Sequence, residues 1–226
     1  MRLMNSKERA YQELVKKRKK YKFPPGLINP ANVKNGIFDK EINIGPWCKW
    51  QGNLNAKIML IGQDWGTVKY YIETKGSHED ESRTNISLIK LFKSIGIDIG
   101  TPSHPNHLAP CFFTNAILGL KDEKAMASKI KDSWIKENAK EFLQPNIKII
   151  KPKIIITLGI NAYKALTHIY GLKKDTLNQL IDKNPIKLEN KSMLFAMYHC
   201  GGLGLANRKW ELQKKDWKKI KDYIYY

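Results

Sequence analysis

The sequence has 226 residues, 42% of them hydrophobic, which is enough for one domain with a substantial core. Lys and Arg number 40 against 21 Asp and Glu, giving a formal net charge of +19, as is typical of proteins that bind nucleic acid. A lysine-rich proteome also makes many proteins basic, so the charge favours nucleic acid without requiring it.

The sequence gives little indication of a secretion signal, a membrane span or disulfide bonds. Its first twenty residues lack the apolar run of a secretion signal, and lysine interrupts each later hydrophobic stretch well short of a membrane span. The three cysteines, Cys48, Cys111 and Cys200, are odd in number and unevenly spaced, which does not suggest a disulfide framework. We therefore expect a cytoplasmic monomer that does not contact membranes.

A basic helix is predicted over about residues 6–21, because Asn5 and Glu8 have the spacing of a capping box and an apolar stripe follows. Near its end, residues 16–20 are all cations. They would either bind phosphate or form a solvated helix end, whose positive charge suits the helix dipole.

Prolines and glycine then interrupt regular structure. We expect residues 1–45 to form a basic helix with an irregular lead-in, and residues 46–226 to form one α/β domain. Near the start of that domain, Trp47 and Trp50 are expected to pack the irregular segment against the core, with stacking on a base as the less favoured alternative.

A short apolar strand is predicted at residues 58–61, a run too short for a stable helix. Gln63, Asp64 and Trp65 follow between two glycines. Open α/β sheets place their chemistry at the carboxyl ends of buried strands, because the loops of neighbouring strands converge there. Asp64 is therefore the first candidate for a catalytic residue.

Further strands and helices alternate along the rest of the chain. Two later strands also end in a polar side chain, Asn115 and His199. The remaining predicted elements are a helix capped by Asn85, strands at 112–114 and 153–158, helices at about 132–150, 160–169 and 176–181, a strand pair at 186–188 and 193–198, and a C-terminal helix capped by Asn207.

Alternating strands and helices predict a mainly parallel sheet with right-handed crossovers, so the loops after successive strands leave at the same edge. We expect Asp64, Asn115 and His199 to meet there. Three apolar strands that each end in one polar residue are hard to attribute to chance. By contrast, His104, His107 and Cys111 lie in a proline-interrupted connection that favours an ordinary loop over a zinc site.

Around these strand ends the sequence resembles the uracil-DNA glycosylase superfamily. Residues 62–64 resemble the opening of its water-activating motif, 114–115 its base-reading strand end, and 199–203 its histidine with the minor-groove wedge loop. Residues 153–166 resemble its third strand and the helix that follows. The resemblance covers about residues 47–208 and implies a three-layer α/β/α sandwich with a four-stranded, mainly parallel sheet.

The resemblance implies hydrolysis of the N-glycosidic bond of uracil or a related deaminated base in DNA, without a cofactor or metal. This reaction places positive charge on the sugar and negative charge on the base, so it needs a carboxylate near one and a donor near the other. Asp64 would stabilise the sugar and orient the attacking water, and His199 would donate to the departing base. Asn115 would read the Watson–Crick edge of the base, and Gln63 would line the same pocket.

A flipped base also needs an aromatic platform, and the gap in the duplex needs a filling side chain. Tyr70 or Tyr71 is the candidate platform, although half-buried packing explains both equally well. Leu203, flanked by glycines, is predicted on an exposed flexible loop and is the candidate wedge. Arg208 and nearby lysines would hold phosphates or simply form a solvated face.

The sequence departs from the family pattern at the positions that set specificity. The best-known branch continues the first motif with Pro-Tyr, where the tyrosine excludes thymine; this chain has Trp65 and Gly66. Branches with glycine there accept a wider set of bases, so we expect these two residues to decide substrate choice. Cys200 and Gly201 replace the Pro and Ser of the wedge loop. Iron–sulfur branches carry four cysteines, so no cluster is expected.

Two other functions stay open at this point. One is a non-catalytic DNA-binding module that kept the fold and altered the pocket. The other is an enzyme acting on free mononucleotides, which would need neither a wedge nor a basic surface.

Overall fold

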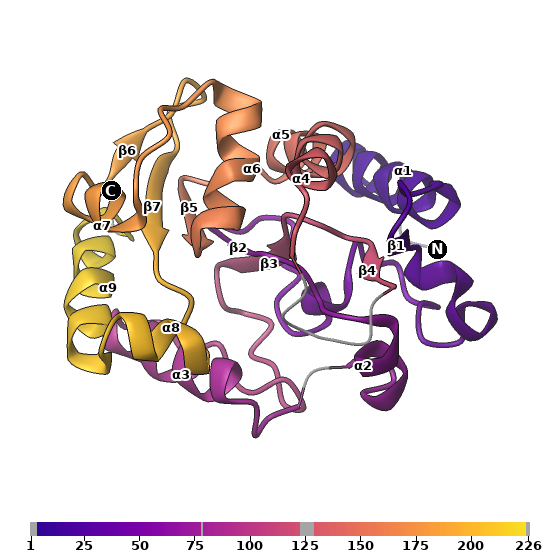
Figure 1. The fold of residues 1–226 in the computed structure, drawn as a ribbon, viewed down its shortest axis with the longest axis horizontal. Helices are drawn as coiled ribbons and strands as arrows, with labels where there is room; N and C mark the ends of the chain where they lie inside the picture. The colour runs from indigo at the N-terminus through magenta and orange to yellow at the C-terminus, as the bar shows by residue number, and fades with distance from the viewer. Residues whose placement is uncertain (1–3, 78, 123–128, 225–226) are drawn as a thin grey trace.

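The computed structural model describes residues 4–77, 79–122 and 129–224. A central sheet lies between two layers of helices, as Figure 1 shows. Its strand order is β3-β2-β5-β7-β6, with the first four strands parallel and β6 antiparallel to β7. The strands are β2 (Ile58–Gly62), β3 (Cys111–Asn115), β5 (Ile154–Leu158), β6 (Ile186–Lys187) and β7 (Met193–Met197).

The predicted α/β/α sandwich with a mainly parallel sheet is confirmed. The described sheet has five strands instead of the expected four, because the short β6 joins its edge through a hairpin with β7. Outside it, β1 (Leu27–Ile28) and β4 (Leu120–Lys121) form a two-stranded antiparallel sheet that the sequence did not predict.

Helices bury both faces of the central sheet. Along β2, Met59 and Ile61 pack into the core on one face, while Ile58 and Leu60 pack into the core on the other. Because both faces are covered, the strand is a continuous apolar run and not an alternating one.

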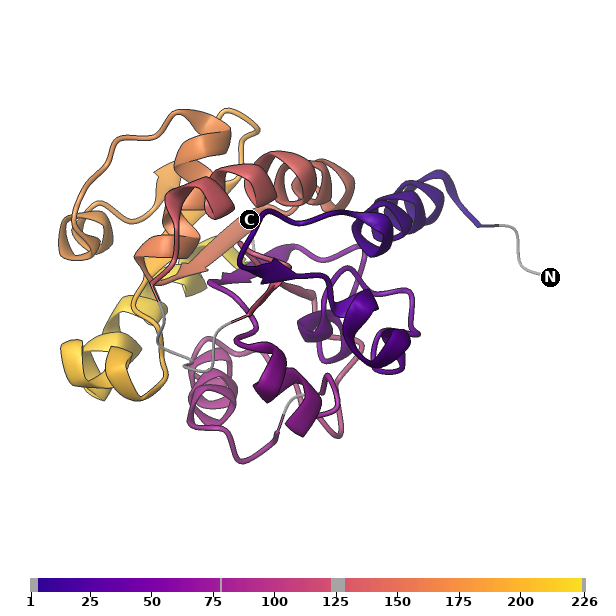
Figure 2. The same ribbon diagram turned by 45° about the vertical axis from the view of Figure 1, so that its right-hand side comes forward.

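The two helical layers lie on opposite sides of the sheet in Figures 1 and 2. One contains α1 (Ser6–Lys20), α4 (Asp132–Asn138), η3 (Ala139–Leu143), α5 (Gln144–Ile150) and α6 (Ile160–Tyr170). The other contains α3 (Arg83–Ser94), α8 (Gly202–Asn207) and α9 (Trp210–Ile224). The remaining short elements are η1 (Pro30–Gly36), η2 (Pro46–Lys49), α2 (Val68–Glu73) and α7 (Leu177–Asp182). None of the described helices is long and apolar enough to cross a membrane.

The cation block at the end of α1 makes intramolecular contacts. Arg18 is fully buried and forms a bidentate ion pair with Asp39 at 2.6 and 2.8 Å. Lys19 donates to the backbone carbonyl of Asp39, and Lys17 pairs with Glu141 at 2.8 Å. These contacts hold the irregular segment and η3 to α1 and give these three cations a structural role, while the other two cations of the block are exposed.

Two helices do not begin where the sequence predicts, and Leu203 lies in a different kind of element from the one expected. Asn85 lies inside α3, which begins at Arg83. Leu203 lies on the short helix α8 and not on a flexible loop, and α9 begins only at Trp210, beyond Asn207. The glycines around Leu203 have low helix propensity, but tertiary packing overrides that preference here.

Candidate active site

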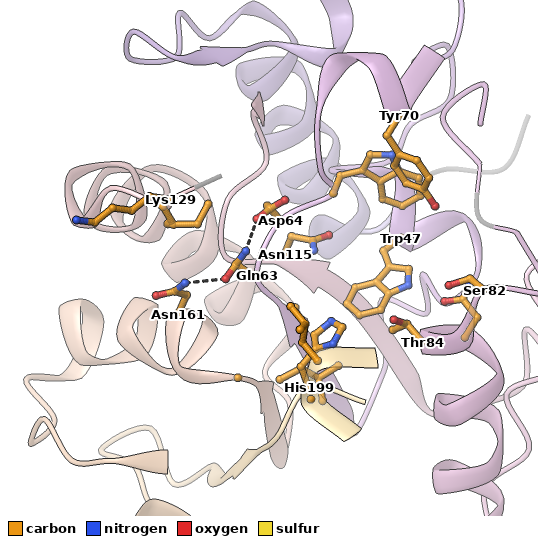
Figure 3. Close-up of a pocket in the computed structure, with 18 residues that line it drawn as sticks. Trp47, Gln63, Asp64, Tyr70, Ser82, Thr84, Asn115, Lys129, Asn161 and His199 are labelled. Atoms are coloured by element: carbon orange, nitrogen blue, oxygen red, sulfur yellow. Dashed lines mark hydrogen bonds between the residues drawn. The ribbon is translucent and has the colours of Figure 1, made fainter. Parts of the chain in front are cut away.

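A cavity of about 850 Å³ lies at the carboxyl ends of the parallel strands. Figure 3 shows its lining side chains. They come from the carboxyl ends of the parallel strands and the segments that follow them, from η2, α3 and α8, and from residues 129–130. Seven of the ten predicted site residues line this cavity: Gln63, Asp64, Trp65, Tyr70, Asn115, His199 and Leu203.

The other three predicted residues lie outside the described cavity lining. Tyr71 is 1% exposed and its ring packs edge-on against Phe38 at 6.0 Å. Gly66 is buried with a φ of 124°, which favours glycine, and its carbonyl accepts from the backbone N–H of Lys121. Arg208 forms a bidentate ion pair with Asp216 at 2.7 and 2.8 Å. Tyr70 is thus the tyrosine of the pair that faces the cavity.

Close packing at the end of β2 explains its glycine. A Cβ atom on Gly62 would lie 2.6 Å from Trp47 Cζ3 and 3.0 Å from Asn115 Nδ2. Gly62 is also paired in register with Asn115 on the neighbouring strand. The absence of a side chain therefore lets the indole and the amide approach the end of β2 closely at the cavity wall.

Asp64 is held on both carboxylate oxygens. Lys121 Nζ lies 3.4 Å from Oδ1, and the side chains of Lys121 and Asp64 are only 1% and 5% exposed. Gln63 Nε2 donates to Oδ2 at 2.6 Å. A carboxylate oxygen can accept two hydrogen bonds, so these contacts fix the group and leave acceptor capacity for a water molecule.

His199 is arranged to be a neutral donor. Burial lowers its pKa below the usual value, and the negative charge of Asp64 opposes this shift more weakly. The backbone N–H of Gly201 donates to Nδ1 at 3.0 Å. Because Nδ1 accepts, the proton of the neutral ring is on Nε2, which is then free to donate.

The same segment carries the exposed Leu203. The backbone of Gly204 packs so closely on the carbonyl of His199 that a Cβ atom would overlap it. Gln213 Nε2 lies within hydrogen-bonding distance of the His199 and Gly204 carbonyl oxygens, at 3.3 and 3.2 Å. Leu203 itself is 78% exposed at the cavity. The position of this side chain is therefore coupled to that of the imidazole.

Sequence reasoning missed two residues that build the site, Asn161 and Lys121. Trp47, which was expected mainly to pack against the core, does so and also lines the cavity. Asn161 follows β5 and bonds to Gln63, and its place just after a buried strand is the signal that had singled out Asp64. Lys121 gave no such signal, because it lies on the unpredicted β4.

The fold and the site define an α/β protein with a polar pocket at the carboxyl edge of a parallel sheet, the usual ligand position in this architecture. Residues 50–223 match the sequence profile of the Uracil DNA glycosylase superfamily, so the chain belongs to this superfamily. The family expected from the sequence is confirmed. A comparison with curated proteins finds no match.

Proposed function

We propose that the protein is a DNA glycosylase that hydrolyses the N-glycosidic bond of uracil or a related deaminated base in DNA. One observation carries the proposal: a buried carboxylate, an amide and an imidazole whose Nδ1 accepts from the backbone line a single cavity. Membership of the superfamily and the net charge of +19 support DNA as the substrate.

In this proposal Asp64 acts on the sugar. As the glycosidic bond breaks, positive charge develops on the sugar ring, and a fixed carboxylate stabilises that charge without reorganising. Lys121 and Gln63 hold the carboxylate in one orientation. A free acceptor site on its oxygens orients the attacking water.

His199 and Asn115 act on the base. The leaving base carries negative charge on its carbonyl oxygen, and the Nε2–H of a neutral His199 donates to it. Asn115 is 6% exposed and lines the cavity, where its amide would both donate to and accept from the Watson–Crick edge. This pairing selects a base with adjacent carbonyl and N–H groups, as in uracil.

Leu203 and Tyr70 support base flipping. Leu203 would fill the gap that the flipped base leaves in the duplex, which its exposure of 78% allows. Tyr70 would provide the stacking platform, with its ring 6.5 Å from that of Trp65. Because Gly66 stands where the best-known branch has tyrosine, we expect the pocket to admit more than uracil. Arg208, paired with Asp216, would contribute to DNA binding mainly by fixing the end of α8.

The test is incubation with oligonucleotides that carry uracil, hypoxanthine, xanthine or mispaired thymine, followed by alkali cleavage at abasic sites. The proposal expects cleavage at uracil or at another deaminated base. Salt-sensitive DNA binding without an abasic product from any of these would instead indicate a non-catalytic DNA-binding module. Activity on free mononucleotides that plain duplex DNA does not inhibit would indicate a nucleotide-metabolising enzyme.

A further inference from the structure

A relay of hydrogen bonds connects the first turn of α6 to Asp64, as the dashed lines in Figure 3 show. Asn161 Nδ2 donates to Gln63 Oε1 at 2.6 Å. Gln63 Nε2 then donates to Asp64 Oδ2, also at 2.6 Å. Since Gln63 follows β2 and Asn161 follows β5, the relay links two neighbouring strands of the sheet.

Asp64, at the end of the relay, fixes the direction of hydrogen-bond donation along it. An ionised carboxylate only accepts hydrogen bonds, so Gln63 has to present its NH₂ group to Asp64 and its carbonyl oxygen to the other side. That oxygen in turn needs a donor, which the NH₂ group of Asn161 supplies. An acceptor in place of Asn161 would draw the NH₂ group of Gln63 away from Asp64 and turn a carbonyl oxygen towards the carboxylate.

We propose that Asn161 is a positioning residue that acts through Gln63 to orient the Asp64 carboxylate. Its importance for catalysis rests on the proposed function, in which Asp64 stabilises the sugar and orients the water. Lys121 fixes the opposite oxygen at 3.4 Å, so the carboxylate is restrained from two sides. Displacement of a reacting group by about 1 Å costs up to about 100-fold in rate.

The first experiment compares Asn161→Asp with Asn161→Ala in single-turnover excision of uracil from an oligonucleotide. At pH 8 the introduced carboxylate accepts from Gln63 and reverses its amide, so the single-turnover rate constant at saturating enzyme falls by about 10-fold to 100-fold. As the pH falls towards 4, near the ordinary pKa of an aspartic acid, about half of the introduced carboxyl groups take up a proton and can donate again. The ratio of the Asn161→Asp rate to the wild-type rate therefore rises, whereas the Asn161→Ala ratio stays constant.

Asn178→Asp is the matched control. Asn178 is exposed on α7, outside the described cavity lining, and its Oδ1 accepts from Tyr198, a role that a carboxylate keeps. This variant should excise uracil at the wild-type rate at every pH. An Asn161→Asp rate equal to wild type at pH 8, or a loss that acidification leaves unchanged, would overturn the proposal.

A second experiment tests the relay whether or not the wild type is active. The urea midpoints of wild type, Asn161→Asp, Asp64→Asn and the double variant form a double-mutant cycle. In the Asp64→Asn background, the introduced amide can turn its NH₂ group towards the carbonyl oxygen of a reversed Gln63. Asn161→Asp should therefore lower the midpoint less than in wild type. Equal losses in the two backgrounds would contradict the relay. Failure of the wild type to release any base would instead contradict the proposed function.

Discussion

Replacing Lys121 with methionine should destabilise the fold far more than replacing one partner of an exposed ion pair. The pair with Asp64 is 3.4 Å long, and its side chains are 1% and 5% exposed. At an effective dielectric constant of about 20, two charges at this separation attract by about 5 kcal/mol. Removing one partner leaves a buried charge uncompensated, which costs about 3 to 5 kcal/mol. We therefore expect Lys121→Met to lower the free energy of unfolding by about 3 kcal/mol or more.

Urea denaturation measures this loss, and Lys183→Met is the control. Lys183 pairs with Asp175 at the shorter distance of 2.7 Å, but its side chain is 53% exposed. Solvent screens such a pair, so we expect a loss below about 1 kcal/mol. In an Asp64→Asn background, which has no carboxylate charge, Lys121→Met should cost less than in wild type. Equal losses in both variants, or in both backgrounds, would refute the reasoning.

Three further predictions test the segment that carries the imidazole. Gly204→Ala should lower the free energy of unfolding by about 1 to 3 kcal/mol and reduce base excision, since its Cβ atom would overlap the His199 carbonyl. Gly202→Ala is its control, because there the nearest atom, Arg83 Nη1, would be 3.5 Å away. Burial lowers the pKa of His199, so its contribution to stability is complete above about pH 6.5 and is lost as the pH falls below that value. His199→Gln should remove this component of the pH dependence, and an unchanged denaturation profile between pH 7 and 5 would contradict it. Leu203→Ala should leave the urea midpoint unchanged, since the side chain is 78% exposed, but should weaken binding to duplex DNA with an abasic site; equal affinity would argue against a wedge.

The sequence was most informative about the central sheet. Four buried strands are short apolar runs, and parallel strands place their carboxyl ends at one edge. Side chains directly after such runs therefore lie close together whatever the details of the helices. This is why Asp64, Asn115 and His199 were predictable as neighbours, and all three line the cavity.

Contacts made by tertiary packing could not be predicted in the same way. Lys121 is buried because a two-residue strand pairs with β1, and so short an element has no sequence period. Arg208 follows α8, a short glycine-containing helix that the sequence did not predict, and its partner Asp216 lies eight positions further on in α9. Leu203 lies in a helix whose Gly204 packs on the carbonyl of His199, a contact that local propensity does not encode.

Detection of the free base released from a uracil-containing oligonucleotide tests the proposed chemistry most directly. Wild type should release free uracil and leave an abasic site. Asp64→Asn and His199→Ala, which should still fold, should each lose most of this activity because one lacks the charge near the sugar and the other the donor near the base. Release of uracil at the wild-type rate by both variants would contradict the assignment of the site.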